Sequence, residues 1–528
     1  MKTVDSRTLN LARVSILTLF AVLVTRLAWL SDDSLITLRT ALNITHGWGP
    51  GFNATESVQG FTHPLWFIIW TGIGATSNQW VLGIIALSVA LSAVAVALVL
   101  WRTRSLGTLI LVSGLLIFSN AFMEYSTSGL ENPLSYVFIT LAFVLTFRLD
   151  QLSQYLNGER IPVHLSILAG LTLSGLFLTR MDLILIVVPV VIFLLWRLRT
   201  SYTTLAIIAV SAIVPITFWF VWSRITYSAW LPNTFTAKSN LDIAQGDLLL
   251  QGLKYFWVSF ENDPITFLGL TIGLIVGFLK GNALIRSWST GIAIYLAYVW
   301  WIGGDFMAGR FLAVPLLIAV LVLASSPTPR LSPTLATVGV LGAVSLSALS
   351  GATPVSLTNT QVQRWEPGLN LNGNIVDERS FYVQNHRDLK FFINNTWIAS
   401  ENPVIASVNS EDLQIRTLNE INKMAQNWPV NSGGFTLPEG VLTECGLLGT
   451  IGLSIGPRNH LIDSCALTDR FLAGIPFVPD PTQGWKPGHF ERIVPAGYQE
   501  AIGANDPNLL VDPAAREQLK VLWEKIRP

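Results

Sequence analysis

Apolar segments of about 17 to 25 residues, the length that crosses a lipid bilayer as a helix, recur through the first two thirds of this 528-residue chain. Only 12% of the residues are charged and 51% are hydrophobic, so the folded chain cannot cover its surface with polar groups. The candidate spans are 12–30, 80–101, 106–121, 133–149, 163–180, 182–198, 203–223, 264–281, 287–302, 311–327 and 333–351. We therefore predict a multi-span α-helical membrane protein with about 11 transmembrane helices, which excludes a soluble enzyme.

The positions of Lys and Arg predict the orientation of the chain, because cytoplasmic loops carry an excess of these residues. With the N-terminus in the cytoplasm, alternate loops are basic, as at Arg102 and Arg104. This alternation requires that segment 63–76 does not cross the membrane, and we expect it to lie in the outer interface, anchored by Trp66 and Trp70. The expected localisation is the plasma membrane, as a multi-pass protein with a cytoplasmic N-terminus.

The composition changes near residue 352, where apolar runs shorten and Asn, Asp, Glu, Pro and Gly become more frequent. We predict a transmembrane catalytic domain over 1–351 and an extracytoplasmic soluble domain of mixed α/β structure over 352–528. Apolar stretches predict strands at 403–408 and 446–453, and polar-apolar periodicity predicts helices at 385–394 and 513–526.

Cys445 and Cys465 are the only cysteines in the chain, and both lie in the predicted extracytoplasmic domain. Disulfides persist in oxidising compartments, so we expect these two residues to form one. The alternative is two unrelated buried thiols.

Polar residues gather in the segments that this topology places at the outer membrane surface, where they are costly and often functional. Asp32 and Asp33 directly follow the first span. One acid there is explained as a helix cap, whereas two adjacent acids suggest a base, a nucleophile or a ligand of a divalent cation. No cofactor is otherwise indicated, and adjacency alone is a weak signal for a metal.

Four further outer segments carry candidate binding residues, namely 127–133, 179–182, 227–238 and 303–310. Each also has a structural explanation. Glu131 suits a helix start, and Arg180 with Asp182 suits a local ion pair. Lys238 suits an interface anchor, while Asp305 and Arg310 suit a turn closed by a salt bridge.

Several classes of function lack their sequence signature. The chain contains no GxxxxGK[ST] loop, and its six histidines show no HExxH or other metal-binding spacing. Its 33 basic and 33 acidic residues leave no net charge and form no basic stripe for a nucleic acid. An outer-face enzyme without nucleotide machinery needs a pre-activated substrate, and a lipid phosphate that carries a sugar fits this requirement.

An ordered set of motifs resembles the AftB-like arabinofuranosyltransferase family, which belongs to the GT-C glycosyltransferases that use polyprenyl-phosphate sugars in mycobacteria and their relatives. The motifs are DD at 32–33, LRT at 38–40, GPxFN at 49–53, TSGLE at 127–131, the segment 231–238, GGDFMxGR at 303–310, IVDER at 375–379 and IDSCALTD at 462–469. The first outer loop, 32–66, carries much of the likeness.

The resemblance implies transfer of D-arabinofuranose from decaprenyl-phosphoryl-arabinose to the terminal residues of cell-wall arabinan, in arabinogalactan or lipoarabinomannan, through a β-(1→2) linkage. Such a transfer retains the anomeric configuration, which requires a carboxylate nucleophile or a front-face attack within an ion pair. Asp32 and Asp33 would be catalytic. The residues expected to bind donor or substrate are Arg39, His63, Glu131, Arg180, Asp182, Asn233, Lys238, Asp305 and Arg310.

The implied partners are the lipid-linked donor, the arabinan acceptor and the lipid bilayer, with no nucleic acid. Two alternatives stay open. One is a GT-C enzyme that uses another polyprenyl-phosphate sugar or a protein acceptor. The other is a transporter or flippase for lipid-linked glycans, which the clustering of acids at one face, rather than through the spans, disfavours.

Overall fold

A computed structural model describes residues 5–155, 161–326, 331–358, 375–382, 396–397, 416–434, 436–479 and 485–527. All eleven predicted spans are helical in it. They correspond to α1 (Ser6–Arg26), α4 (Leu82–Arg102), α5 (Leu106–Ile117), α7 (Asn132–Tyr155), α8 (Val163–Thr179), α9 (Ile184–Arg197), α10 (Tyr202–Tyr227), α13 (Pro264–Lys280), α14 (Ala283–Trp301), α15 (Ala313–Ser325) and α16 (Pro333–Leu349).

Not all of these eleven helices are long and apolar enough to cross a membrane by themselves. Within the described ranges, α1, α4, α7 and α10 meet that criterion, and α12 (Gln245–Asn262) joins α13 through a 109° bend as a fifth candidate. Helices α5, α8 and α16 are apolar but shorter. The helical character of the predicted spans is therefore confirmed, whereas their number as membrane crossings stays a prediction.

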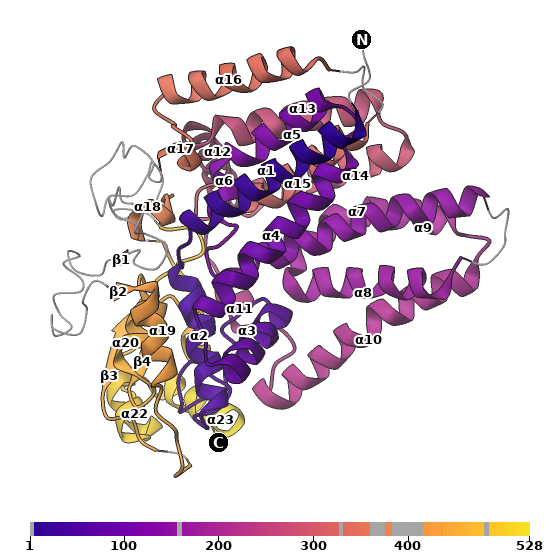
Figure 1. The fold of residues 1–528 in the computed structure, drawn as a ribbon. Coiled ribbons are helices and arrows are strands. Elements are labelled where there is room, and N and C mark those ends of the chain that lie inside the picture. Colours follow the sequence, from indigo (N-terminus) through magenta and orange to yellow (C-terminus); the bar gives the residue numbers. More distant parts are fainter. Residues whose placement is uncertain are drawn as a thin grey trace.

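The core of the bundle surrounds α15. Every residue from Ala313 to Ala324 is buried, as expected of a helix that is apolar on all sides, and α15 packs on α5, α7, α13 and α14. In contrast, α10 exposes Val210, Val214 and Phe218. Together with α7, α8 and α9 it extends away from the C-terminal region (Figure 1). An apolar helix with so little protein cover is suited to contact with lipid chains.

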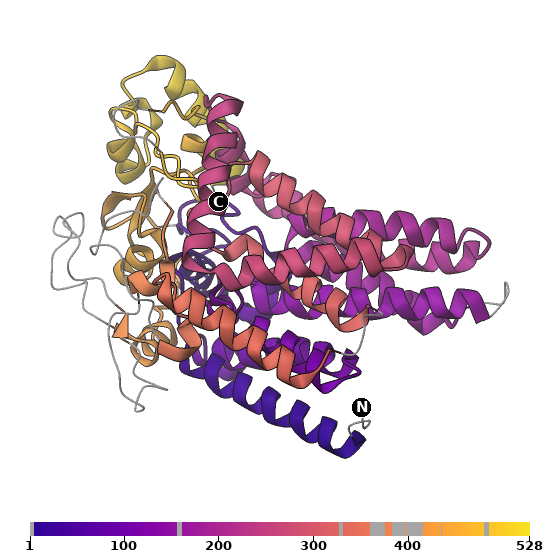
Figure 2. The same cartoon turned by 90° about the horizontal axis from the view of Figure 1, so that it is seen from above.

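Short helices gather at the end of the bundle that meets the C-terminal region, as both views show (Figure 1, Figure 2). They are α2 (Asp32–Thr45), α3 (Pro64–Ser77), α6 (Asn120–Glu124), α11 (Asn233–Ser239) and α17 (Val355–Thr358), with the 3-10 turns η1 (Met181–Leu183) and η2 (Arg310–Leu312). These elements and the loops between them carry most of the polar motifs found in the sequence.

The helix expected at 63–76 is present as α3, and its place relative to the membrane stays a prediction, but the role predicted for its tryptophans is wrong. Trp66 and Trp70 are fully buried inside the protein. Their indole N–H groups donate to the carbonyls of Gly129 and Trp80, at 2.9 Å and 2.7 Å. A Trp that anchors a helix at a membrane interface has one apolar end and one wet end, whereas both of these rings are enclosed by protein.

The C-terminal region contains helices and short strands. A βαβ unit consists of β3 (Val441–Glu444), α20 (Leu448–Ile455) and β4 (His460–Asp463), with the strands parallel and Val441 opposite His460. The other elements are α18 (Glu378–Tyr382), α19 (Leu418–Gln426), α21 (Arg470–Ala473), α22 (Tyr498–Ala504), η5 (Pro507–Leu509), α23 (Pro513–Ile526) and the antiparallel pair β1 (Thr396–Trp397) and β2 (Arg416–Thr417).

The secondary-structure predictions for this region have mixed outcomes. The helix expected at 513–526 is α23, with the same bounds. The strand expected at 446–453 is wrong, because most of that segment forms α20. A short apolar run does not distinguish a buried helix from a buried strand, and here a distant carboxylate caps the helix. The segments 385–394 and 403–408 lie outside the described residues.

Cys445 and Cys465 form the predicted disulfide. Each cysteine comes just after a strand of the parallel pair, Cys445 after β3 and Cys465 after β4. The bond therefore closes the βαβ unit at the end where both strands leave it.

We expect the paired substitution Cys445→Ala and Cys465→Ala to lower the stability of the C-terminal region by about 3 kcal/mol, because it opens a loop whose ends are 20 residues apart. Thermal unfolding followed by tryptophan fluorescence measures the loss. A reducing agent should lower the Tm of the unsubstituted protein to a similar degree and leave the double variant unchanged. Equal Tm values for the two oxidised proteins would contradict a stabilising bond.

Candidate active site

The two adjacent acids at the start of α2 point to different partners. Ser31 caps α2 through a 3.3 Å hydrogen bond from the Ser34 amide, so neither acid is needed as its cap. Asp32 is buried and accepts hydrogen bonds from the amides of Gly449 and Thr450, both at 2.8 Å, at the start of α20. Burial raises the pKa of Asp32 to about 6, although these hydrogen bonds favour the anion. Asp32 is therefore an anchor for the C-terminal region.

Asp33 remains accessible, with 22% of its side chain exposed, and faces Arg310 at 3.7 Å. The main chain fixes its position, because the Ser31 amide donates to the Ser128 carbonyl at 2.9 Å. This bond joins the segment that carries the two acids to the segment that ends at Glu131. Of the two predicted catalytic acids, Asp33 is the one that forms an ion pair within the described residues.

Glu131 is buried at the centre of a cluster of charged side chains. The other members of this cluster are Asp33, His63, Arg180, Asp182, Asp305 and Arg310. Its carboxylate oxygens lie 3.3 Å from His63 Nδ1, 3.4 Å from Arg310 and 3.7 Å from Arg180. Burial alone would raise the pKa of Glu131, but the charges of Arg310, His63 and Arg180 outweigh it and lower that pKa. Glu131 is thus an anion that holds two arginines in place.

Arg310 joins the carboxylates of three separate segments. Besides Asp33 and Glu131, its guanidinium lies 3.7 Å from Asp305. The loop that carries both residues turns through Gly304, whose φ of +75° favours glycine, and a Cβ there would lie 2.4 Å from Tyr255. Burial raises the pKa of Asp305, while Arg310 and Lys238 oppose that rise.

Arg180 and Asp182 form the local ion pair that the sequence offered as an alternative to substrate binding. They also belong to the cluster, because Arg180 lies close to Glu131. Arg180 is buried and donates to Asp182 and, at 2.9 Å, to the hydroxyl of Tyr295. Its Nε also approaches Glu131, as described above. The Nη1 group of Arg180 is buried and has no hydrogen-bond partner among the described residues.

Two predicted binding residues lie elsewhere, and their contacts are structural. Arg39 is fully buried and donates to the carbonyls of Phe52, Gly452 and Asn459. Asn233 donates to carbonyls in the turn that precedes α21. These contacts hold the C-terminal region to the bundle, and a role of either residue in substrate binding stays a prediction. Apart from that of Phe52, those carbonyls come from segments far away in sequence, so motif spacing could not reveal the contacts.

Three residues of the C-terminal region lie beside the cluster but were not among the predicted site residues. They are Glu378, Lys486 and His489. The Lys486 ammonium lies 4.1 Å from the centre of the Phe306 ring, and the His489 ring packs edge-on against that ring. Glu378 falls within the IVDER motif, and Lys486 lies in a Trp-Lys-Pro-Gly-His segment. These polar motifs are the sequence signal that could have identified the two residues as part of the site.

Lys238, at the C-terminal end of α11, is exposed and lies beside the same loop. A Cβ added at Gly488 would come within 3.2 Å of its Nζ and 3.8 Å of Asp305. Lys238 and the 485–489 loop therefore border the cluster on the side of the C-terminal region.

No group of three or more His, Cys, Asp or Glu side chains is arranged to hold a metal within the described ranges. The carboxylate of Asp32 is engaged with α20, and Arg310 lies close to both Asp33 and Asp305. A requirement for a divalent cation at the adjacent acids stays a prediction.

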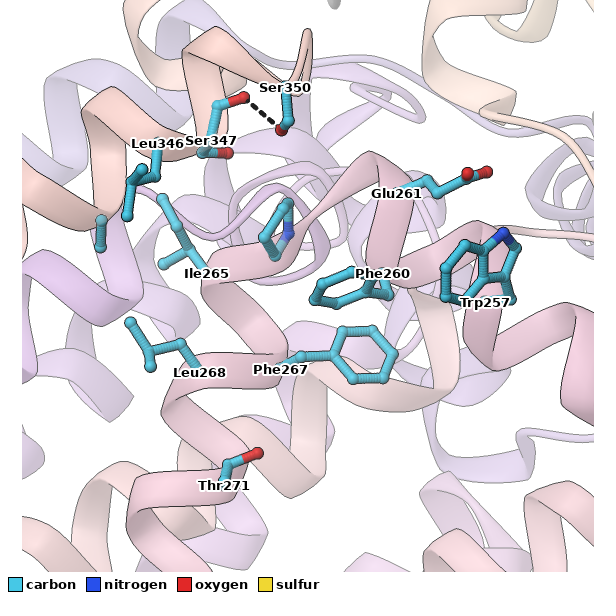
Figure 3. A pocket seen from close by; sticks show the side chains of 12 residues that line it. Trp257, Phe260, Glu261, Ile265, Phe267, Leu268, Thr271, Leu346, Ser347 and Ser350 are labelled. Carbon is cyan, nitrogen blue, oxygen red and sulfur yellow. Dashed lines mark hydrogen bonds between the residues drawn. The ribbon is translucent and has the colours of Figure 1, made fainter.

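A cavity of about 760 Å³ lies apart from this cluster, between α12, α13 and α16 (Figure 3). Its lining is mostly apolar and includes Trp257, Phe260 and Leu268, with Glu261 also in the lining. Other residues of α12 meet the loop of the cluster, since the Gly309 amide donates to Ser259 and the Phe311 amide to Tyr255. Helix α12 therefore contributes to both places, and the cavity contains none of the predicted site residues.

We expect Asp32→Asn to destabilise the contact between α2 and α20 by about 1–3 kcal/mol, because the amide NH₂ cannot accept from a buried backbone N–H. Thermal unfolding of the purified protein measures this change. Asp33→Asn is the matched control and should leave the Tm nearly unchanged, since its carboxylate is partly solvated. An unaltered Tm in Asp32→Asn would contradict the anchoring role.

No protein-family model matches the chain. It is 26% identical over 477 residues to a Corynebacterium glutamicum protein named terminal beta-(1->2)-arabinofuranosyltransferase, covering 81% of this chain and 66% of that protein. It is 27% identical over 332 residues to the Mycobacterium tuberculosis protein of the same name, covering 54% of this chain and 51% of that protein. The chain thus spans about two thirds and about half of the length of these curated relatives. These similarities support the resemblance to the AftB-like arabinofuranosyltransferases that the motifs show.

Proposed function

We propose that this chain is a membrane glycosyltransferase that transfers D-arabinofuranose from decaprenyl-phosphoryl-arabinose to the terminal residues of cell-wall arabinan. The linkage formed is β-(1→2), in arabinogalactan or lipoarabinomannan. The two relatives support the sugar and the linkage through their names. The observation that carries the proposal is the accessible Asp33 beside Arg310, within a cluster of acids and cations at one end of an apolar bundle.

The chemistry assigned to the cluster follows from its charges. Asp33 is the carboxylate that meets the anomeric carbon, either as a nucleophile or as the counter-charge of an ion pair. Arg310 and Lys238 offer positive charge to the departing lipid phosphate, where negative charge develops as the sugar bond breaks. Glu131 and Asp182 orient Arg310 and Arg180 through the ion pairs described above.

The proposed orientation places this end of the bundle at the outer face of the plasma membrane. The donor's polyprenyl tail then lies among lipid chains while its phosphate reaches the cluster. The glycan acceptor approaches from the aqueous side, where the C-terminal region lies. The alternation of basic loops along the sequence supports this orientation.

We expect the purified protein to transfer radiolabelled arabinose from a synthetic lipid-phosphate donor to a short arabinan acceptor. Asp33→Asn should lower this transfer by about 100-fold or more, because the amide is neither a nucleophile nor a counter-charge. Asp247→Asn, at an exposed position of α12, is the matched control and should transfer normally. Undiminished transfer by Asp33→Asn would overturn the role of this acid. Acceptance of other lipid-linked sugars but not arabinose would overturn the proposed donor.

We also expect Lys238→Gln to raise the KM for the lipid-phosphate donor by about tenfold, the effect of losing one charged contact to phosphate. Its KM for the arabinan acceptor should stay near that of the unsubstituted protein. Lys254→Gln removes an exposed charge from α12 and serves as the control. Steady-state kinetics with each substrate varied in turn measures both constants. A raised acceptor KM with an unchanged donor KM would assign Lys238 to the acceptor instead.

A further inference from the structure

We propose that Glu378 is a second catalytic carboxyl of this site, which gives a proton to the departing lipid phosphate and then takes one from the acceptor hydroxyl. This inference rests on the proposed function, because it assigns a residue to that reaction. It draws on the position of Glu378 in the fold, on its burial and on the charges around it.

The position of Glu378 is fixed by a strand-like contact with the loop that carries Asp305 and Arg310. The Val376 amide donates to the Phe306 carbonyl at 2.7 Å, and the Ala308 amide donates to the Val376 carbonyl at 2.9 Å. On the other side, Arg379 donates to the Leu27 carbonyl at 3.1 Å, just before α2. Glu378 is thus held between the Arg310 loop and the segment that leads to Asp33.

The side chain of Glu378 is buried, with 4% exposure, and its Oε2 has no hydrogen-bond partner among the described residues. None of the ion pairs within 4.0 Å in the described part of the chain includes it. A buried polar atom without a partner is costly, which favours a position reserved for a ligand. The neighbouring Asp377 has a local role, since it accepts from the Ser380 amide at 3.0 Å.

The charges nearest to Glu378 belong to the proposed site. Burial raises its pKa well above the usual value, and the negative charge of Asp33 adds to that rise, while Lys486 and Arg310 oppose it. Two carboxyls that share a site do not both ionise readily. In the proposed reaction Glu378 is the carboxyl that carries the proton and Asp33 is the carboxylate that meets the anomeric carbon, which is the division of roles that a retaining transfer requires.

The proposed cycle balances. In the first displacement an Asp33 oxygen bonds to the anomeric carbon, the bond from that carbon to the phosphate oxygen breaks, and Glu378 gives its proton to the departing phosphate. In the second, the acceptor oxygen bonds to the anomeric carbon, its proton passes to Glu378, and the bond to Asp33 breaks. Asp33 regains its electron pair and Glu378 its proton, and the anomeric configuration is retained.

Azide tests this assignment, because it attacks the anomeric carbon without losing a proton. We expect Glu378→Gln and Glu378→Ala to lower transfer to arabinan by about 100-fold or more. Added azide should increase the release of lipid phosphate by Glu378→Ala about tenfold or more and yield arabinofuranosyl azide. Glu439→Gln, at an exposed ion pair of the C-terminal region, is the matched control and should show neither effect.

Two results would overturn the role of Glu378. One is normal transfer by Glu378→Gln. The other is a folded Glu378→Ala, judged by an unchanged Tm, that stays inactive with azide, since a residue that only positions its neighbours is not replaced by an anion. If the unsubstituted protein transfers no arabinose, the proposed function fails and this inference fails with it. Normal activity of the unsubstituted protein combined with either result above rejects Glu378 alone.

Discussion

One guanidinium joins the parts of this molecule that carry polar chemistry. Arg310 contacts Asp33, Glu131 and Asp305, which come from three segments far apart in the sequence. In a chain with only 12% charged residues, charges at the edge of an apolar bundle are stable only when they are paired. Removal of this cation would take away the ion pairs of Asp33 and Asp305 and leave Glu131 with His63 and Arg180, so the arrangement of the cluster depends on it.

A second set of contacts holds the C-terminal region against that cluster. Asp32 accepts from the start of α20, and Arg39 donates to three carbonyls, two of which belong to the same region. Both residues lie on α2, Asp32 directly before Asp33 and Arg39 six residues after it. Helix α2 therefore presents one acid to the site while its neighbours fasten the region that supplies Glu378 and Lys486. These contacts explain why so many polar residues, including Asp32, Asp33 and Arg39, directly follow the first predicted span.

The sequence predicted the helical bundle well, because long apolar runs have few stable alternatives in a bilayer. It also predicted the disulfide, the helix at 513–526 and the convergence of Asp33, Glu131 and Arg310 at one end. It failed where a contact between distant segments decides the outcome. Trp66 and Trp70 became core residues, and an apolar run expected to be a strand became α20.

What the sequence determined by itself was which residues must avoid water and which charged groups must find partners. Composition and the spacing of apolar runs are sufficient for that, since both depend on local chemistry. Only the tertiary structure decided the roles of the adjacent acids. Asp32 and Asp33 are chemically identical neighbours, yet the approach of α20 engages the first and leaves the second beside Arg310. That approach depends on contacts across more than 400 residues, which no local pattern encodes.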